Sequence, residues 1–315
     1  MREIRHGQFG LPALLVAGFV LAGCSQQKIP PSKMPLSKDT IMLLGKKGMT
    51  ARAPIFVRIF KEESELEIWK ARADGHFYHF KTYPICTWSG GLGPKFKQGD
   101  KQAPEGFYTI ANYQLNPHSK YHLSFNLGFP NAYDKAHGRT GNFLMVHGKC
   151  SSAGCYAMTD ALVEEIYGLA RDALDGGQKA FQVDAFPFRM TDENMARHKT
   201  NKAYRFWRML KVGYDDFELT RVPPKIDVCG GRYLVNMEFA GKWRGRKLRA
   251  NRACPHHQRA SLVPFLPTGA KAQKLASQRI SVPGMKRRVF ARRTLPDGLA
   301  TGYGLTRSPS PDLSR

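Results

Sequence analysis

The sequence lacks any internal apolar run of about 20 residues, the length that a membrane-spanning helix requires. It is also poor in acidic residues, because 25 Asp and Glu stand against 49 Lys and Arg, giving a formal net charge of +24. Such a chain is attracted to anionic partners such as nucleic acid, a membrane surface or an anionic envelope polymer. Hydrophobic residues still make up 42% of the 315 residues, so the chain can bury a sizeable core.

The first residues of the chain narrow this range of partners. A basic start precedes a short apolar stretch over residues 11–22, which is too short to span a bilayer and has the form of a secretory signal. Small residues stand directly before Cys24, as at the processing site of a bacterial lipoprotein. We therefore predict a signal peptide over residues 1–23 and a lipid on Cys24. An ordinary signal peptide beside a chance cysteine is the alternative.

Export determines the compartment that we expect. A lipid on Cys24 would hold the protein on the periplasmic side of a Gram-negative membrane, and Ser25 in place of Asp indicates the outer membrane. We expect a membrane partner through this anchor and no nucleic acid.

The cysteine count points to a free thiol. The six cysteines are Cys24, Cys86, Cys150, Cys155, Cys229 and Cys254. Exported cysteines tend to pair because their compartment is oxidising, and five remain if Cys24 is lipidated. An odd number leaves at least one thiol free or bonded to something else, and a free exported thiol is a candidate nucleophile. We expect Cys86 to be buried or disulfide-bonded, while the pairing itself stays open.

The middle of the chain has the pattern of a mostly β, α+β domain. Residues 24–53 are polar and are interpreted as a tether, so the folded domain is predicted over residues 54–238. Short segments with the pattern of strands are residues 55–60, 65–69, 77–80, 107–110, 121–125, 143–146 and 232–237. Helical periods follow over residues 160–174, capped by Asp160 and ended by Gly176-Gly177, and over residues 203–211.

The C-terminal part, residues 239–315, is predicted to be a disordered basic tail. From residue 241 onward it holds 17 Lys and Arg but only 2 Asp and Glu, with Pro, Gly and Ser throughout and no sustained apolar period. The tail either binds anionic envelope polymers or lipid headgroups, or is a plain solvated extension. Its Cys254-Pro255-His256-His257 run hints at a metal, but in a disordered tail it is interpreted as incidental.

One run of residues carries the chemistry. The strand at residues 143–146 delivers His147, a loop of small residues follows, and Cys155 stands just ahead of the predicted helix. Sulfur attacks as the thiolate, which a neighbouring imidazole and a helix N-terminus both favour. Gly154 and the small residues before it leave backbone N–H groups accessible to an oxyanion.

Spacing and composition leave other roles open for these residues. Cys155 is alternatively a buried structural thiol or half of a disulfide with Cys150, and His147 is alternatively an inert core histidine. Zinc bound by His147, Cys150 and Cys155 would need a fourth ligand and closer spacing.

A resemblance to a known family favours catalysis. The run resembles the L,D-transpeptidase catalytic domain (YkuD-type), whose His-Gly and Ser-x-Gly-Cys signature is matched by His147-Gly148 and Ser152-Ala153-Gly154-Cys155. Its YafK-like branch ends Gly-Cys-x-Ala-Met-Thr-Asp, as residues 154–160 do here. Further segments similar to that branch are residues 61–67, 81–86, 102–106, 131–134, 136–141 and 186–190.

The resemblance implies a β-sandwich catalytic domain with helices after the cysteine, an acyl-enzyme mechanism, and no cofactor or metal. Cys155 would attack the carbonyl of the meso-diaminopimelyl residue in a peptidoglycan stem peptide, with His147 as its base. Ser152 and the backbone at Gly154 and Cys155 would shape the oxyanion site, and Gly148 is assigned to it as well. An amine would then resolve the thioester in transpeptidation, or water would do so in hydrolysis.

Two alanines depart from the broader family and leave the acceptor open. Many members carry His directly before the Gly-Cys pair and Arg two positions after Cys, where this chain has Ala153 and Ala157. This puts conventional wall cross-linking in doubt. Some members of the YafK-like branch resemble amidases that detach a wall-linked outer-membrane lipoprotein, which would then be a further partner. A hypothesis of another class is a non-catalytic lipoprotein that binds the wall through its basic tail.

Two further residues are candidates for the substrate cleft. His137 lies in a Gly-rich segment and is predicted either to line the cleft or to be a turn residue. Arg139 is predicted either to bind a stem-peptide carboxylate or to be a solvated loop charge.

Overall fold

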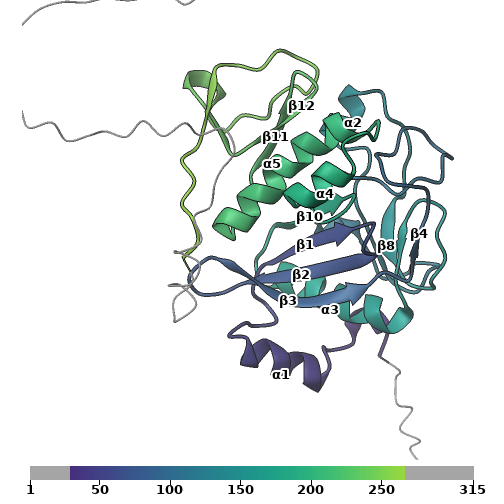
Figure 1. The fold of residues 1–315 in the computed structure, drawn as a ribbon. Helices are drawn as coiled ribbons and strands as arrows, with labels where there is room; N and C mark the ends of the chain where they lie inside the picture. Colours follow the sequence, from purple (N-terminus) through teal and green to yellow (C-terminus); the bar gives the residue numbers. More distant parts are fainter. Residues whose placement is uncertain (1–28, 267–315) are drawn as a thin grey trace, which may run out of the picture. The chain divides into compact units, whose positions relative to one another are not determined.

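The computed structural model describes residues 29–266, so Cys24 and the predicted signal peptide lie outside the described residues, as does the tail from residue 267 onward. The described part is a mixed α+β fold with two five-stranded sheets (Figure 1). The α+β prediction is confirmed at this level. Within residues 29–266, no helix has the length and apolarity that crossing a membrane requires.

The larger sheet has the strand order β3-β2-β1-β10-β5. Its strands are β1 (Ile55–Phe60), β2 (Glu65–Ala71), β3 (Phe77–Pro84), β5 (Gly106–Ala111) and β10 (Ala180–Phe186). Strands β1 and β10 are parallel, and the other pairs are antiparallel. The first four strands were predicted from alternation, whereas β10 was missed, although Phe181, Val183 and Ala185 alternate with polar residues and are fully buried.

The smaller sheet has the order β4-β9-β8-β7-β6 and carries the His147–Cys155 run. Its strands are β4 (Thr87–Trp88), β6 (Leu115–Asn116), β7 (Ser124–Asn126), β8 (Met145–His147) and β9 (Tyr156–Ala157). Strands β8 and β9 are parallel, with Val146 opposite Tyr156 and His147 opposite Ala157. The strands predicted over residues 121–125 and 143–146 therefore overlap β7 and β8 in sequence.

The helices cover both faces of the larger sheet. They are α1 (Lys38–Lys46), α2 (Ala132–Ala136), α3 (Asp160–Asp175), α4 (Asp192–Arg197) and α5 (Tyr204–Thr220), with short 3₁₀ turns at Pro31–Lys33, Asn112–Gln114 and Gly241–Trp243. Figure 1 shows α4 and α5 on one side of β1–β3, with α1 and α3 on the other. Residues of β1 divide accordingly: Val57 joins the core shared by α3 and both sheets, while Phe60 packs with α5.

Helix α3 begins one residue away from the predicted cap. The Thr159 side chain is the N-cap and accepts a hydrogen bond from the Leu162 N–H at 3.3 Å. Asp160 is the first helical residue, and its Oδ1 accepts the Lys149 N–H at 2.8 Å instead. The carboxylate therefore ties the loop after His147 to the helix N-terminus, where negative charge is favourable. The predicted helix end is confirmed, because Gly176 is the C-cap.

The prediction of a tether over residues 24–53 is wrong for the described stretch 29–53. Ser37 caps α1, Leu44 is buried, and the Thr40 hydroxyl donates to Glu165 of α3 at 3.1 Å. Arg171 of α3 also donates to backbone carbonyls of residues 32 and 34. Only two α1 residues are buried, and these contacts with α3 hold the segment on the fold.

The predicted boundary at residue 238 is also wrong, because it cuts a hairpin. Strands β13 (Met237–Phe239) and β14 (His257–Arg259) pair antiparallel, after the hairpin of β11 (Ile226–Cys229) and β12 (Arg232–Val235). A disulfide joins Cys229 to Cys254, so residues 239–266 are not disordered. The hairpin has few apolar residues, and a disulfide supplies a constraint that composition does not reveal. It also makes Cys254 unavailable as a thiolate metal ligand.

We predict that Asp184 of β10 makes stability fall as pH rises. Burial raises the pKa of its carboxyl to about 8, and although Oδ1 accepts from Gln182 at 2.8 Å, Oδ2 has no partner among the described residues. The protonated acid is therefore favoured in the folded protein up to about pH 8, whereas the unfolded chain ionises near pH 4. The free energy of unfolding should decrease between about pH 4 and about pH 8.

Replacing Asp184 by Asn should remove this decrease, because the amide is neutral and nearly isosteric. The free energy of unfolding would be measured by urea unfolding at about pH 5 and about pH 8. Relative to the wild type, the Asp184→Asn variant should be more stable at the higher pH than at the lower pH. The exposed Asp175→Asn variant is the control for loss of one carboxyl. A pH-independent difference in stability between the Asp184→Asn variant and the wild type would contradict the prediction.

Candidate active site

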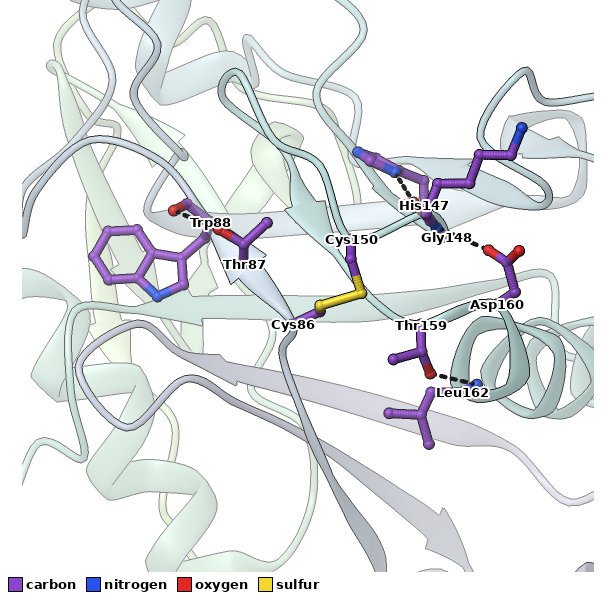
Figure 2. Close-up of a disulfide and its surroundings, with 10 residues drawn as sticks. Cys86, Thr87, Trp88, His147, Gly148, Cys150, Thr159, Asp160 and Leu162 are labelled. Carbon is purple, nitrogen blue, oxygen red and sulfur yellow. Dashed lines mark hydrogen bonds between the residues drawn. A yellow bond between two sulfur atoms is a disulfide. The ribbon is translucent and has the colours of Figure 1, made fainter.

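His147 is held as a neutral base at the end of β8. Only 3% of the residue is exposed, and Nδ1 lies 2.6 Å from the Gly148 carbonyl oxygen (Figure 2). A carbonyl can only accept, so Nδ1 carries the hydrogen and Nε2 keeps the lone pair. Burial lowers the pKa of His147, although the Gly148 hydrogen bond opposes this. The imidazole is therefore an uncharged proton acceptor at neutral pH.

Gly148 is required by close packing. A Cβ at this position would lie 2.5 Å from Asp160 Oδ1 and 3.0 Å from the Tyr121 carbonyl oxygen. The Gly148 N–H donates to the Tyr121 carbonyl at 3.0 Å, so it is not open to an oxyanion. The structure thus gives Gly148 a packing role in place of the predicted oxyanion role.

Tyr121 covers the imidazole and was not identified from the sequence. Its ring centroid lies 4.6 Å from that of His147 with an interplanar angle of 43°, while the residue is half exposed. The ring therefore stands between His147 and solvent. The sequence placed Tyr121 only at a strand edge, and nothing in its neighbours signals contact with a residue so far along the chain.

Cys155 lies beside β8 through the parallel register of β9. Its Sγ accepts the Met145 N–H at 3.4 Å and lies 3.6 Å from the Phe143 carbonyl oxygen. The Met145 contact places Cys155 beside β8, and Met145 precedes His147 by two residues. Because side chains alternate along a strand, Met145 and His147 share one face of β8. That face is opposite to the one carrying the core residues Val146 and Tyr156.

The resting Cys155 is a neutral thiol. Burial raises its pKa, and the Met145 N–H and the charge of Lys95 offset this only in part. Helix α3 begins at Asp160, beyond β9, so its N-terminus does not directly follow the thiol. A separate base must therefore take the proton when sulfur attacks, and the neutral imidazole of His147 has that capacity.

Ser152 braces the loop that carries the nucleophile. Its Oγ accepts the N–H of Cys155 at 3.1 Å and that of Gly154 at 3.3 Å, and donates to the Cys155 carbonyl at 2.8 Å. The two predicted oxyanion donors are therefore occupied by the hydroxyl. Either N–H can serve an oxyanion only after the Ser152 side chain turns away. Gly154 has φ +126°, a value that L side chains rarely adopt, so this loop needs glycine there.

A disulfide clamps the segment between the two candidate catalytic residues. Cys150 is bonded to Cys86, which directly precedes β4 (Figure 2). The backbone N–H groups of Cys86 and Cys150 donate to the carbonyl oxygens of Ala157 at 2.9 Å and Met158 at 3.2 Å. This pairing excludes the alternative Cys150–Cys155 disulfide and removes Cys150 from the zinc ligands considered above. Cys155 is the free cysteine among the described residues.

His137 and Arg139 contact an aromatic cluster, with no direct contact to His147 or Cys155 in residues 29–266. The His137 ring lies 4.1 Å from Tyr133, and its Nδ1 donates to the Tyr133 carbonyl. Arg139 is buried, pairs with Asp134 at 2.7 Å, and lies over Tyr133 and Phe206. The interpretation of Arg139 as a solvated loop charge is therefore wrong. That Arg139 binds a stem-peptide carboxylate stays a prediction, and its guanidinium is already paired with Asp134.

Lys95 is a buried charge near the nucleophile that sequence reading missed. Its Nζ donates to Asp100 and to the Lys97 carbonyl, and only 3% of the residue is exposed. Its positive charge acts to lower the pKa of Cys155. Lysines are usually solvated, so one lysine among 49 basic residues gives no signal in the sequence.

Two comparisons match the chain by sequence. A family model described as the L,D-transpeptidase catalytic domain (YkuD) matches residues 72–215, which include His147 and Cys155. YafK of Escherichia coli, whose name assigns it to the L,D-transpeptidases, is 43% identical over 245 residues, covering 78% of this chain and 94% of YafK. Both the K12 and the O157:H7 proteins match to this extent.

Two solved structures show a weaker likeness. The helical cell shape determining protein Pgp2 from Campylobacter jejuni is 18% identical with a TM-score of 0.34, over 60% of this chain and 80% of Pgp2. Bd1075 of Bdellovibrio bacteriovorus is 18% identical with a TM-score of 0.30, over 60% and 65% of the two chains. The assignment to a family rests on the sequence matches alone.

We predict that Cys155 is alkylated slowly at neutral pH. Iodoacetamide reacts with the thiolate, and burial raises the pKa of the thiol, so the rate should increase with pH and titrate above the usual cysteine range. Intact-mass measurement across a pH series gives this apparent pKa, and urea-unfolded protein with its disulfides intact provides the reference for an exposed thiol. An apparent pKa below that reference would instead reveal a resting thiolate–imidazolium pair.

We predict that the Cys86–Cys150 disulfide holds the loop of residues 148–155 in place. The Cys86→Ser/Cys150→Ser variant should exchange the amide hydrogens of this loop about tenfold faster or more. The Cys229→Ser/Cys254→Ser variant is the matched control. Removing either disulfide should cost about 2–5 kcal/mol of stability. Equal exchange in this loop for both double variants would show that the clamp is not local.

Proposed function

Because the chain belongs to the L,D-transpeptidase family, we propose that it is a peptidoglycan-remodelling cysteine enzyme that forms a thioester at Cys155 with a stem peptide. The observation that carries the proposal is the free Cys155 thiol beside β8, whose end holds the neutral His147. The non-catalytic hypothesis leaves this arrangement without a purpose. The family implies peptidoglycan peptides as the substrate class.

The proposed reaction has two acyl-transfer steps. His147 Nε2 takes the proton from Cys155 Sγ as sulfur attacks the carbonyl carbon of the meso-diaminopimelyl residue. The tetrahedral intermediate collapses, the C–N bond breaks, and the imidazolium returns its proton to the leaving amine. An amine or water then attacks the thioester carbonyl and gives its proton to His147. The C–S bond breaks, and the departing sulfur takes that proton from the imidazolium, which restores the thiol. Burial of both residues keeps them uncharged at rest, so charge develops only as the reaction proceeds.

The acceptor in the second step separates two versions of the proposal. Transpeptidation uses a second stem-peptide amine, whereas an amidase that detaches a wall-linked outer-membrane lipoprotein uses water. The small Ala153 and Ala157 beside Cys155 favour the second version, because they replace the His and Arg of the broader family. Ala157 is fully buried opposite His147, so a longer side chain there would need a rearranged sheet.

The proposed location is the periplasmic face of the outer membrane, with Cys24 as the lipid anchor. Two disulfides among the described residues support an oxidising compartment, because cytosolic proteins rarely keep such bonds. The anchor itself is testable by metabolic labelling with a fatty acid. A wild-type chain should take up the label, and a Cys24→Ser chain should not.

We predict that Cys155→Ala and His147→Ala abolish turnover. Residues 25–315, which include the whole described unit, would be incubated with muropeptides and with lipoprotein-linked peptidoglycan, and the products would be identified by mass spectrometry. Loss of the nucleophile or the base should reduce product formation by on the order of a thousandfold. The exposed His118→Ala variant is the matched control for His147.

The same products identify the acceptor. New cross-links indicate an amine acceptor, whereas lipoprotein release with incorporation of isotopically labelled water indicates hydrolysis. Equal product release by the wild type and Cys155→Ala would refute catalysis by Cys155. The Cys86→Ser/Cys150→Ser variant should form product at a rate between those of the wild type and Cys155→Ala. It keeps Cys155 and His147 but loses the disulfide that holds the loop between them.

A further inference from the structure

The segment of residues 241–252, here named the basic loop, lies between β13 and β14 and carries an unusual density of positive charge. Its six cations are Lys242, Arg244, Arg246, Lys247, Arg249 and Arg252, and it contains no acidic residue. All six are exposed, and none forms an ion pair with a carboxylate of residues 29–266. Other arginines of the fold, such as Arg58 and Arg139, are paired and buried.

The basic loop is anchored to the rest of the fold. The Cys229–Cys254 disulfide ties its C-terminal end to the β11–β12 hairpin, where Gly230 and Gly231 donate to the carbonyl oxygens of Arg252 at 2.7 Å and Ala250 at 2.9 Å. Pairing of β13 with β14 closes its base. The cations are therefore presented together by a closed loop, which lowers the entropy cost of engaging one surface with all of them.

An exposed indole lies among these cations. Trp243 is 38% exposed, and Lys242 Nζ lies 5.8 Å from its ring centroid. By contrast, Trp69 and Trp207 are buried in the core. Tryptophan favours the headgroup region of a bilayer, where its apolar ring and its N–H are both accommodated. Cations alone fit any polyanion, but cations around an exposed tryptophan fit a lipid surface.

A hollow beside the loop adds a place for a headgroup. It has a volume of about 630 Å³ and is lined in part by Lys225, Arg244 and His256. Glu238 also lines it, so the hollow is not uniformly positive. Arg244 belongs to both the loop and the hollow, which makes it the most informative single position.

We propose that the basic loop binds the surface of an anionic phospholipid bilayer. Figure 1 shows this yellow-green segment far from β4 and β8, so contact with a membrane would leave Cys155 and His147 free to act. Each cation near such a surface strengthens binding about fivefold, so the cations of this loop suffice for a strong, salt-sensitive attachment. The proposal does not rest on the reaction of Cys155 or on a lipid at Cys24.

The test is co-sedimentation of residues 25–315, which carry no acyl chain, with vesicles. Phosphatidylcholine vesicles are compared with vesicles containing about a quarter phosphatidylglycerol. The Arg244→Gln/Arg246→Gln/Arg249→Gln variant should bind the anionic vesicles on the order of a hundredfold more weakly. The Lys46→Gln/Lys179→Gln/Arg208→Gln variant is the matched control, because it removes three exposed cations elsewhere and should bind almost as the wild type does.

Three outcomes separate the proposal from its competitors. Binding that needs phosphatidylglycerol, weakens at about 1 M salt and falls in the loop variant supports it. Equal binding by the loop variant overturns it and assigns the interaction to the tail from residue 267 onward, which truncation after Leu266 would verify. Loop-dependent binding to isolated wall sacculi but not to vesicles overturns it in favour of a wall polymer. Quenching of Trp243 emission by brominated lipid, absent in Trp243→Phe, reports insertion of the indole itself.

Discussion

The parallel pairing of β8 with β9 is the interaction on which the candidate active site depends. It joins two short strands, one ending at His147 and the other beginning directly after Cys155, and Cys155 contacts Met145 of β8. A slip of one residue would reverse the faces of the β9 side chains and move Cys155 away from Met145. The contacts around the pair act against such a slip. The Cys86–Cys150 disulfide clamps the connecting loop, Asp160 holds Lys149, and close packing at Gly148 leaves no room for a side chain.

The same burial that orders the site also sets its electrostatics. Desolvation raises the pKa of Cys155 and lowers that of His147, so both shifts favour the neutral pair over the thiolate–imidazolium pair. Sequence reasoning counted a neighbouring imidazole and a helix end, which favour the thiolate, without the cost of removing the thiol from water. A neutral pair limits reaction with adventitious electrophiles, and it makes proton transfer to His147 part of the attack itself.

The sequence allowed the chemistry to be predicted better than its surroundings. His147 and Cys155 follow from a local motif, and the strands of the larger sheet from alternation. Tyr121, Lys95 and the partner of Cys150 become neighbours of this motif only through tertiary folding, and no local pattern encodes them. Contacts with α3 hold helix α1, and a disulfide holds the segment that leads to β14, and neither is visible in a local pattern. Strand β10 is different, since its alternation was present and was overlooked.

The two disulfides divide the described part of the chain between two tasks. One lies between the nucleophile and its base, where small displacements alter the chemistry. The other ties the C-terminal end of the basic loop, whose cations form no ion pair within residues 29–266, to the β11–β12 hairpin. Every other cysteine of residues 29–266 is in a disulfide, so Cys155 is the free thiol that the odd number of cysteines predicted. An enzyme whose substrate is a fixed polymer gains little from free diffusion. If the basic loop, held by its own disulfide, binds a membrane, the enzyme would stay close to its polymeric substrate.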